Sequence, residues 1–492
     1  MRRNKYFIAI LILAAGLVLN GCGGSIQSGP QGGMFTFQSG SLALFGTDAP
    51  LCDVYSFQVT ITGATLTPAG GGSEVAVITS SSPVTVDFAR LVDFANLLKL
   101  SNVPVGRYSA MTLTLSNPVL MVLDVTQTPP APVLVPNTSL TVSTVTVNLR
   151  PALEVTQGKA SGLMIDFSLL KSVETDTNGQ VTGLVAPVFQ AGMTVPSERD
   201  GVGRAQEMRG IVRSVSTTSS NTAFTGSFTL QAHGGVGPIF TINTTSNTRY
   251  EGLTGLPDLA ASDFVEVDAM VDTGGAILAR EVERQGDEPL SSQRAAVLGR
   301  VVSVTRDNAG AAIEFVMVVR EVYPDLTQSI PLGSPLTIHL QPETFFGIVR
   351  SAINEAQLTF DAKSLGVGES VAVRGLIQPG LPITVDARGV FLKPRTVLGN
   401  FNTLLADMGD GKTGGFTLTP CGSLFAAQPV TVLTFNDTEF SGVSGLAGLD
   451  PKPIVGVRGL LFYEQDSGIA NGAAWTAPAW VLEANRVRQH EQ

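Results

Sequence analysis

Alternation of apolar and polar residues with a period of two is the main pattern along this chain. Residues 55–62 place Tyr, Phe, Val and Ile on one face and hydroxyl or amide side chains on the other, and residues 145–149 alternate similarly. This period is typical of half-buried β-strands, so we predict an all-β protein. Residues 88–99 differ, because their apolar residues recur at spacings of three and four, and we predict there a short helix that packs on a sheet. The residues with this spacing are Phe88, Leu91, Val92, Ala95 and Leu98.

The N-terminus has the pattern of an export signal. Residues 1–5 carry three positive charges, and residues 6–19 form an uncharged apolar run that is too short to span a bilayer as a helix. The sequence Leu19-Asn20-Gly21-Cys22 follows and resembles the bacterial lipobox. The resemblance implies a signal peptide over residues 1–21 and a lipid anchor on Cys22. The alternative is an ordinary secreted protein with an incidental cysteine near its cleavage site.

Residues 22–37 are rich in Gly and Ser, and we predict that they form a flexible tether between the membrane and the folded part. Gly23 stands where many inner-membrane lipoproteins of Gram-negative bacteria carry Asp. We therefore expect a lipid-anchored protein of the bacterial cell envelope, at the outer membrane.

The first folded domain is expected over residues 38–196 as a β-sandwich-like domain that includes the short helix. Its motifs are a strand that leads into Thr47-Asp48-Ala49-Pro50, an apolar pair followed by Pro-x-Gly-x-Tyr over residues 97–108, and an Asp-Phe strand over residues 163–172. These motifs, in this order, resemble the family known as domain of unknown function 4382. That family has no established activity, so the resemblance implies a fold and no function.

The remainder of the chain contains three repeats, expected over residues 205–286, 295–393 and 396–490. Each repeat opens with a glycine, at 210, 299 and 399, and continues with a Thr-x-aromatic motif and an Ala-x-x-Val motif. A spacing of about 90 to 100 residues suits a small independent domain, and five or six strands suit a closed barrel that leaves no exposed edge. The pattern resembles domain of unknown function 5666, which implies OB-like barrels. Charged boundaries are expected near residues 197–201, 285–289 and 393–395.

The amino-acid composition argues against several classes of function. The chain has 31 Lys and Arg against 41 Asp and Glu, a net charge of −10, which argues against binding to a nucleic-acid backbone. Three His and three Cys leave little material for metal sites or for catalysis based on histidine. We expect no metal, no cofactor and no enzymatic activity.

Four residues are candidates for ligand binding. Asp48 precedes Ala49-Pro50, and Asp166 lies between apolar neighbours on a predicted strand; the alternative for Asp48 is a turn cap. Trp475 and Trp480 lie close in sequence and could stack on sugar rings, or instead pack in a core. Together with Asp87, the two aspartates could also provide the paired carboxylates of a hydrolase.

Cys52 and Cys421 are the two cysteines that remain after lipidation of Cys22. They lie in different predicted domains, so we expect two unpaired thiols. A disulfide is permitted outside the cytoplasm, but it would require the last repeat to dock on the first domain.

The expected function is that of a lipid-anchored extracytoplasmic β-rich scaffold or binding protein of the bacterial envelope. Its partners would be the membrane, through the lipid on Cys22, and a glycan or an envelope protein. The alternative is a carboxylate-based hydrolase that acts on envelope or extracellular polysaccharide.

Overall fold

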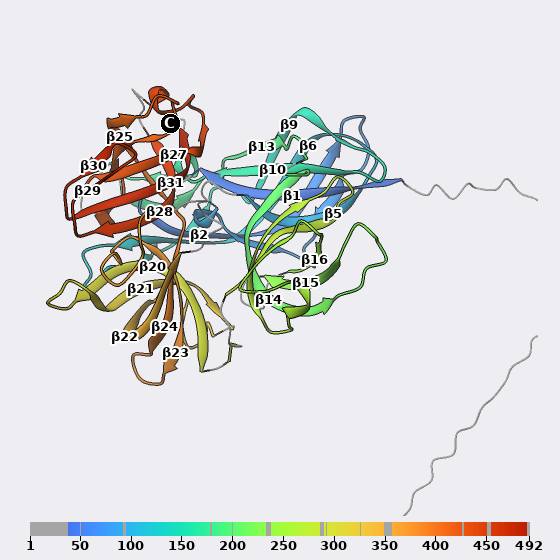
Figure 1. Ribbon diagram of the computed structural model, residues 1–492. Helices are drawn as coiled ribbons and strands as arrows, with labels where there is room; N and C mark the ends of the chain where they lie inside the picture. Colours follow the sequence, from blue (N-terminus) through green and yellow to red (C-terminus); the bar gives the residue numbers. More distant parts are fainter. Residues whose placement is uncertain are drawn as a thin grey trace, which may run out of the picture. The chain divides into compact units, whose positions relative to one another are not determined.

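The structure is a computed structural model, and it describes most of the chain from residue 38 onwards. The described residues are 38–49, 51–91, 95–177, 180–198, 200–232, 238–285, 290–291, 293–324, 326–348, 357–425, 428–449 and 454–489. The expected signal peptide, the lipidation site Cys22 and the tether lie outside them. Residues 38–492 form one compact unit, which contains a sandwich domain and three closed barrels (Figure 1).

The sandwich domain, called domain 1 here, packs two sheets face to face. The first sheet has the order β13-β10-β1-β5, and the second is built on β2 and β6, which β3, β4, β7 and β9 extend. The elements are β1 (Ser39–Ala49), β2 (Val54–Pro68), β3 (Val75–Ile78), β4 (Val84–Asp87), β5 (Asn96–Pro104), β6 (Gly106–Asp124), β7 (Ala131–Leu134), β9 (Thr144–Val155), β10 (Ala160–Ser168) and β13 (Phe189–Met193). A small third sheet contains β8 (Ser139–Leu140), β11 (Val173–Thr175) and β12 (Val181–Val185), and the helices are η1 (Phe88–Arg90) and α1 (Leu169–Ser172).

The prediction of a helix over residues 88–99 is wrong, because the helical turn is much shorter than expected. Among the described residues of this range, only Phe88–Arg90 form a turn of 3-10 helix, and β5 begins at Asn96. Val92, which was part of the predicted pattern, lies outside the described residues. Phe88, Leu91 and Leu98 do reach the sandwich core, whereas Leu97 faces the opposite side of its sheet. The helical spacing is therefore produced by a turn followed by a strand that is buried on both faces.

Strand β1 lies in the middle of its sheet, parallel to β10 and antiparallel to β5. Leu42 and Leu44 point into the sandwich core, and Ala43 and Phe45 point into a second core shared with the following barrel. All four side chains are fully buried. A strand covered on both faces reads as a continuous apolar run rather than as an alternating one.

Barrel 1 contains β14 to β19, barrel 2 contains β20 to β24, and barrel 3 contains β25 to β28 and β31. In barrel 1, β16 and β17 are two parts of one interrupted third strand, so that each barrel has five strand positions. In each barrel the first strand pairs with the second and the fourth, the second with the third, and the third lies parallel to the fifth, which closes the barrel. This confirms the expectation of three OB-like barrels after a sandwich-like domain. The strands of barrel 1 are β14 (Gly203–Ser216), β15 (Gly226–Ala232), β16 (Ile239–Thr244), β17 (Arg249–Glu251), β18 (Phe264–Val271) and β19 (Ile277–Arg284).

The other two barrels use longer strands. Those of barrel 2 are β20 (Arg294–Arg306), β21 (Ala312–Tyr323), β22 (Pro335–Ile348), β23 (Ser370–Gln378) and β24 (Thr384–Lys393). Those of barrel 3 are β25 (Arg395–Asp407), β26 (Gly414–Pro420), β27 (Val430–Ser441), β28 (Val455–Glu464) and β31 (Ala479–Gln489), with a hairpin of β29 (Gly468–Ala470) and β30 (Ala473–Trp475). Short 3-10 turns lie at η3 (Leu256–Asp258), η5 (Ser423–Phe425) and η6 (Leu446–Gly448).

The repeated threonine closes each barrel at the same point. The parallel ladder between the third and fifth strands is interrupted there, between Leu340 and Phe345 in barrel 2 and between Thr434 and Glu439 in barrel 3. The threonine hydroxyl donates to the carbonyl of the repeated alanine and accepts a backbone N–H three residues before it. The donor distances are 2.8 Å for Thr248 to Ala279, 2.9 Å for Thr344 to Ala387 and 2.8 Å for Thr438 to Ala484.

Steric contact with the neighbouring strand explains why each repeat opens with a glycine. A Cβ atom at Gly210, Gly299 or Gly399 would lie 2.1 to 2.3 Å from a backbone oxygen of the neighbouring strand. No side chain fits at that separation, so the first strand can approach its neighbour closely only where it carries glycine.

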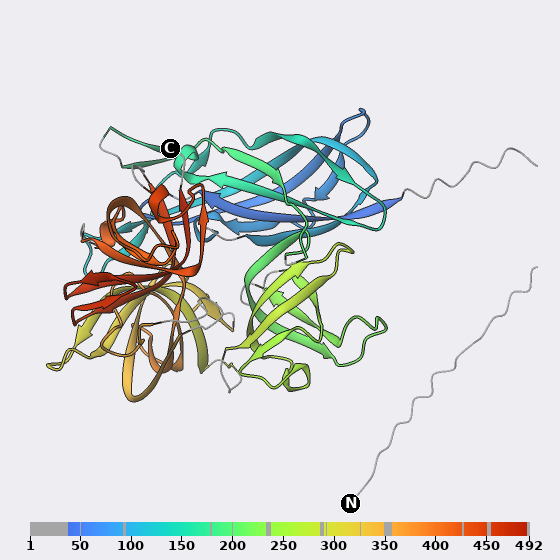
Figure 2. The same cartoon turned by 45° about the horizontal axis from the view of Figure 1, so that its top comes forward.

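The four domains surround a common centre, as two views of the molecule show (Figures 1 and 2). Phe264 of barrel 1 stacks on Tyr323 of barrel 2, with ring centroids 4.1 Å apart. Tyr55 of domain 1 donates a hydrogen bond to the carbonyl of Val318 in barrel 2 at 2.9 Å. Phe462 of barrel 3 belongs to the core of barrel 2. Tyr55 and Leu123 of domain 1 also pack with Val302 and Val318 of barrel 2, so apolar contacts join barrel 2 to each of the other three domains.

Replacement of the barrel-closing threonine tests its contribution. Thr438→Val keeps the shape of the side chain but removes the bond to Ala484 and the bond from the Phe435 N–H, both at 2.8 Å in a buried position. We expect a loss of about 1–3 kcal/mol in the free energy of unfolding, because buried polar groups lose their partner. Denaturant unfolding measures it, and Thr403→Val, on an exposed face of the same barrel, is the matched control. Equal effects of the two substitutions would contradict this role.

A buried carboxylate connects barrels 2 and 3. Glu483 on β31 is fully buried, and its Oε1 atom accepts the backbone N–H groups of Gln357 and Leu358 at 2.8 and 2.9 Å. Burial raises the pKa of Glu483 to about 7, although the two N–H groups oppose the shift. The folded protein therefore holds a proton here that the unfolded chain, with a carboxyl pKa of about 4.3, releases.

This difference predicts a dependence of stability on pH. The contribution of Glu483 is most favourable below the unfolded pKa and is lost as the pH rises towards 7. Glu483→Gln removes the ionisation. We therefore expect the effect of this substitution on the free energy of unfolding to be ~2 kcal/mol more favourable at pH 8 than at pH 5. Urea unfolding at both pH values measures the difference. The exposed Glu343→Gln is the control, and an identical pH response in the two variants would refute the prediction.

Candidate functional site

A cavity lies where the four domains meet. Its volume is about 170 Å³, and each domain contributes residues to its wall. Lys and Arg outnumber Asp and Glu among these residues, in a chain whose net charge is negative. The basic residues of the wall are Arg90, Arg209, Arg300, Arg320, Lys393, Arg395 and Arg458, and the acidic ones are Asp53, Glu207 and Glu321.

One group of these charges is paired. Arg209 of β14 donates to Glu266 and Glu207 of its own barrel at 2.8 and 2.5 Å, and lies 3.4 Å from Glu321 of barrel 2. Lys393, the last residue of β24, lies 2.8 Å from Glu266. The network therefore joins barrels 1 and 2.

The same acids bind residues of the other two domains. Glu207 pairs with Arg458 of barrel 3, and Glu321 pairs with Arg90 of domain 1 and accepts the Tyr323 hydroxyl at 2.6 Å. The paired charges therefore connect all four domains.

The ion pairs strongly shift the pKa of Glu266, the carboxylate that both Arg209 and Lys393 contact. Burial alone would raise the pKa of Glu266, but the positive charges of Arg209 and Lys393 outweigh it and lower the pKa to about 2. The carboxylates of Glu266 and Glu207 raise the pKa of Arg209, although burial alone would lower it. Glu266 and Arg209 are therefore both charged at neutral pH.

A second group of charges lacks such partners. Arg300 of β20, Arg320 of β21 and Arg395 of β25 make no ion pair with any described carboxylate. They lie instead over aromatic rings: Arg300 and Arg320 over Tyr55, at 5.7 and 4.7 Å from the ring centroid, and Arg395 over Phe425 at 5.3 Å. Arg320 also donates to the carbonyl of Tyr55 at 3.1 Å, and Arg395 to the carbonyl of Gly368.

These three guanidinium groups repel one another. Burial, followed by the charges of Arg395 and Arg320, lowers the pKa of Arg300 well below its usual value. Burial and Arg320 lower the pKa of Arg395 to about 9. Asp53 acts on Arg300 and Glu369 acts on Arg395 in the opposite sense, but neither outweighs burial. Because a guanidinium stays protonated in proteins, these directions indicate a cationic site whose counter-charge is incomplete.

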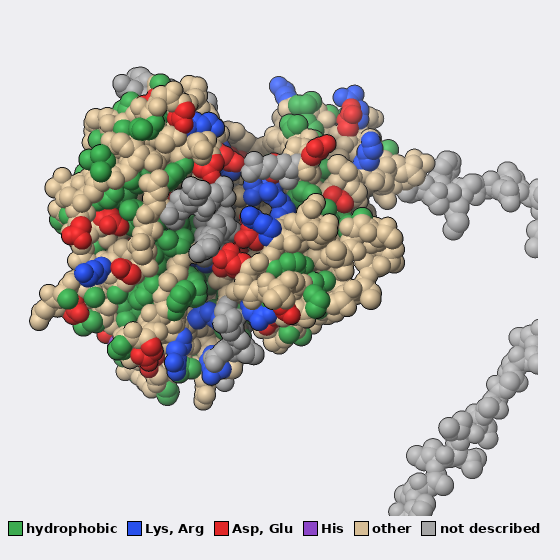
Figure 3. Space-filling model, viewed as in Figure 1, with side chains coloured by type: hydrophobic (Ala, Val, Ile, Leu, Met, Phe, Trp, Pro, Cys, Tyr) green, Lys and Arg blue, Asp and Glu red, His purple; other side chains and the backbone are tan. Residues whose placement is uncertain are grey.

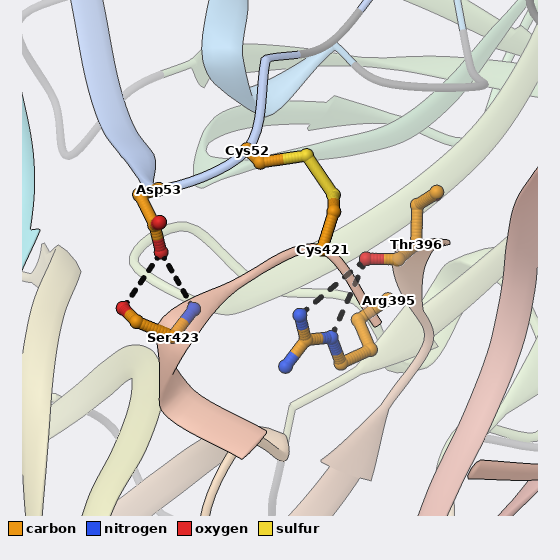
Figure 4. The surroundings of a disulfide bond; sticks show 6 residues. All are labelled: Cys52, Asp53, Arg395, Thr396, Cys421 and Ser423. Carbon is orange, nitrogen blue, oxygen red and sulfur yellow. Dashed lines mark hydrogen bonds between the residues drawn. A yellow bond between two sulfur atoms is a disulfide. The ribbon is translucent and has the colours of Figure 1, made fainter. Parts of the chain in front are cut away.

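A disulfide forms part of the cavity wall and corrects the expectation for the two cysteines (Figure 4). Cys52 of domain 1 and Cys421 of barrel 3 are bonded, with their Cα atoms 5.8 Å apart and a separation of 369 positions in sequence. The expectation of unpaired thiols is wrong because barrel 3 does dock on domain 1. Beside the bond, the carboxylate of Asp53 accepts the N–H and the hydroxyl of Ser423 at 2.9 and 2.8 Å.

A larger, more open hollow of about 1080 Å³ lies between barrels 1 and 3. Figure 3 shows basic and acidic side chains close together where the two sides of the molecule face each other. Equivalent cross-strand positions of the two barrels carry opposite charges: Arg249 pairs with Glu281 at 2.5 Å, whereas Glu439 pairs with Arg486 at 2.8 Å. The wall of this hollow is therefore close to balanced in charge.

The structure does not bring the predicted aspartates together. Asp48 lies in β1, fully buried on the face of the sheet that carries Phe167, and accepts the N–H of Leu169 at 3.3 Å. Asp166 lies in β10 on the opposite face, 3.8 Å from Arg488 of barrel 3. Asp87 accepts the Ser56 hydroxyl and the Phe57 N–H at 2.8 and 3.0 Å. None of the three aspartates lines either cavity.

The two tryptophans also occupy separate places. Trp475 packs against the Leu433 and Val481 side chains, and its indole N–H donates to the carbonyl of Asp466 at 3.0 Å. Trp480 donates to the carbonyl of Val367 at 2.9 Å. This bond joins barrel 3 to barrel 2. The Trp480 ring also makes edge contacts with Phe425 and Tyr463 of its own barrel. Trp475 is buried, whereas Trp480 is half-buried.

Sequence reasoning missed the residues of the central cavity. Residues 393–395 were expected to be a domain boundary, yet Lys393 and Arg395 are both buried on the cavity wall. A usable signal was present, because Arg458 stands in a Val-x-Val-Arg-Gly motif that two of the repeats share. An arginine inside an otherwise apolar strand motif indicates a buried or interfacial charge.

Among the described residues, no group of three or more His, Cys, Asp and Glu side chains is placed to hold a metal ion. No helix in the described part of the chain has the length and apolar character needed to cross a bilayer.

Comparison with known proteins supports the two resemblances. Residues 39–182 match the family model described as Domain of unknown function (DUF4382), and residues 209–283 match Domain of unknown function (DUF5666). No curated protein matches this chain. Among solved structures, one titled "drosophila Unr CSD456" is similar at 10% identity, over 58% of this chain and 98% of that chain, with a TM-score of 0.13.

The paired charges should contribute strongly to stability. Arg209→Gln would leave Glu266 and Glu207 buried with less counter-charge, so we expect a loss of about 3 kcal/mol or more in the free energy of unfolding. The control is Arg249→Gln, since Arg249 is 73% exposed and its ion pair should contribute only about 0–1 kcal/mol. Denaturant unfolding compares the two variants, and losses of equal size would show that the buried network is not the stabilising element.

Proposed function

We propose that this protein is a lipid-anchored extracytoplasmic scaffold or binding protein of the bacterial envelope. The observation that carries the proposal is the disulfide between Cys52 and Cys421. Disulfides persist in compartments outside the cytoplasm, and this one connects the first folded domain to the last. It supports export of the whole folded part, in agreement with the signal-like sequence over residues 1–21.

The lipid anchor is proposed on Cys22. The chain has three cysteines, and the disulfide uses two of them, which leaves Cys22 as the cysteine available for modification. The Gly- and Ser-rich residues that follow suit a tether. We place the protein at the outer membrane because residue 23 is Gly rather than Asp.

The binding role is favoured over the hydrolase alternative. Hydrolysis by two carboxylates requires both groups to face one substrate, and Asp48 and Asp166 point to opposite faces of the same sheet. The arginine-lined cavity offers charges suited to holding a ligand. A glycan or an envelope protein is proposed as a partner at the outer surface, and no nucleic acid is expected from a net charge of −10.

The anchor is tested by metabolic labelling in a Gram-negative bacterium with a palmitate analogue. We expect the full chain to incorporate the label and to fractionate with the outer membrane, and the Cys22→Ser variant to lose both properties. The matched control is the Cys52→Ser/Cys421→Ser double variant, which removes the other two cysteines and should still be labelled. Label that persists on Cys22→Ser, or a wild-type chain that is unlabelled and soluble, would refute the anchor.

A further inference from the structure

The unpaired arginines of the central cavity point to a ligand class. We propose that the cavity binds a phosphate-type oxyanion, either free phosphate or the phosphate group of a small phosphomonoester, through Arg300, Arg320 and Arg395. The inference rests on the binding role proposed above and is independent of the lipid anchor, because the cavity lies wholly within the folded unit.

The first support is that the three arginines converge on one cavity. The three arginines come from the first two strands of barrel 2 and the first strand of barrel 3, and all three line the same cavity. Their charges are close enough to perturb one another. Arg395 is only 8% exposed, and the Nε atoms of Arg300 and Arg320 are buried without a hydrogen-bond partner. Buried donors that face a cavity without an acceptor suit a ligand that supplies the acceptor.

The second support is the balance of charge. The acids of the cavity wall are already engaged: Glu207 and Glu321 pair with other arginines, and Asp53 accepts two bonds from Ser423. The three remaining guanidinium groups form no ion pair with any described carboxylate. Asp53 acts on Arg300 and the buried Glu369 acts on Arg395, but only from beyond ion-pair distance, and burial raises the pKa of Glu369 well above its usual value. Their positive charges are therefore only partly compensated. An unpaired buried cation destabilises a protein, and a bound anion removes that cost.

The third support is the match of ligand to site. A guanidinium binds phosphate or carboxylate oxygens through two parallel bonds. A phosphate group carries about −1.5 to −2 charges near neutral pH and several acceptor oxygens, so it balances three arginines better than a single carboxylate. The volume of about 170 Å³ also suffices, since a water molecule needs only about 10–15 Å³ on the same measure.

The test is equilibrium dialysis of the purified full-length protein with radiolabelled inorganic phosphate, in chloride buffer of constant ionic strength. We expect saturable binding of one phosphate per chain. Arg300→Gln and Arg395→Gln should each weaken binding by about tenfold or more, the loss of a charge-assisted bond. The control Arg107→Gln removes the same charge at a side chain that is 66% exposed on domain 1, and should leave binding unchanged.

Stability provides a second measurement that separates binding from misfolding. In phosphate-free buffer, Arg300→Gln should unfold at the same temperature as the wild type or higher, because it removes a buried cation without a partner. Added phosphate should raise the unfolding temperature of the wild type more than that of this variant. Equal gains in both would overturn the assignment to these arginines.

Competition identifies the source of the phosphate group. Displacement of labelled phosphate by glycerol 3-phosphate would support a phosphomonoester ligand, and displacement by unlabelled phosphate alone would support the free ion. Binding of acetate without binding of phosphate, or no saturable phosphate binding at all, would overturn the proposal. These outcomes do not depend on Cys22, so failure here and failure of the labelling experiment are distinguishable.

Discussion

The charges buried at the centre of this molecule determine how its four domains can be arranged. Arg209 binds Glu266 and Glu207 within barrel 1 and approaches Glu321 of barrel 2, and these acids in turn hold residues of barrel 3 and of domain 1. Buried ions are tolerated only when partners compensate their desolvation, so each domain needs the others in place. The Cys52–Cys421 bond acts on the same junction, because it joins domain 1 to barrel 3 at the cavity wall.

Comparison of the three barrels shows which positions are identical in every repeat and which positions differ. The threonine hydroxyl spans the interrupted ladder in every copy, and the opening glycine permits a close approach that no side chain allows. Neighbouring positions change freely in charge, since Arg249 and Glu281 in barrel 1 correspond to Glu439 and Arg486 in barrel 3. Closure of the barrel depends on the threonine and the glycine, whereas the charged pairs lie on the wall of the hollow between barrels 1 and 3.

Sequence patterns predicted the parts of the fold that depend on neighbours along the chain. Period-two alternation indicated the strands, and the repeated Gly, Thr and Ala positions indicated three barrels of one topology. The prediction over residues 88–99 was wrong because Leu97 and Leu98 are both buried, on opposite faces of one sheet. The candidate site was missed for a related reason: Arg300, Arg320 and Arg395 are far apart in sequence and share no motif.

The sequence by itself determined the all-β class, the sandwich-like first domain, the three barrels that follow and the export-like N-terminus, because each depends on local periodicity or on short motifs. Only the tertiary structure decided that Cys52 bonds to Cys421, that Asp48 and Asp166 face opposite sides of a sheet, and that unpaired arginines line one cavity. These properties arise where separate domains dock. Docking depends on the complementary shape and charge of surfaces built from residues that are hundreds of positions apart, and no local pattern records it.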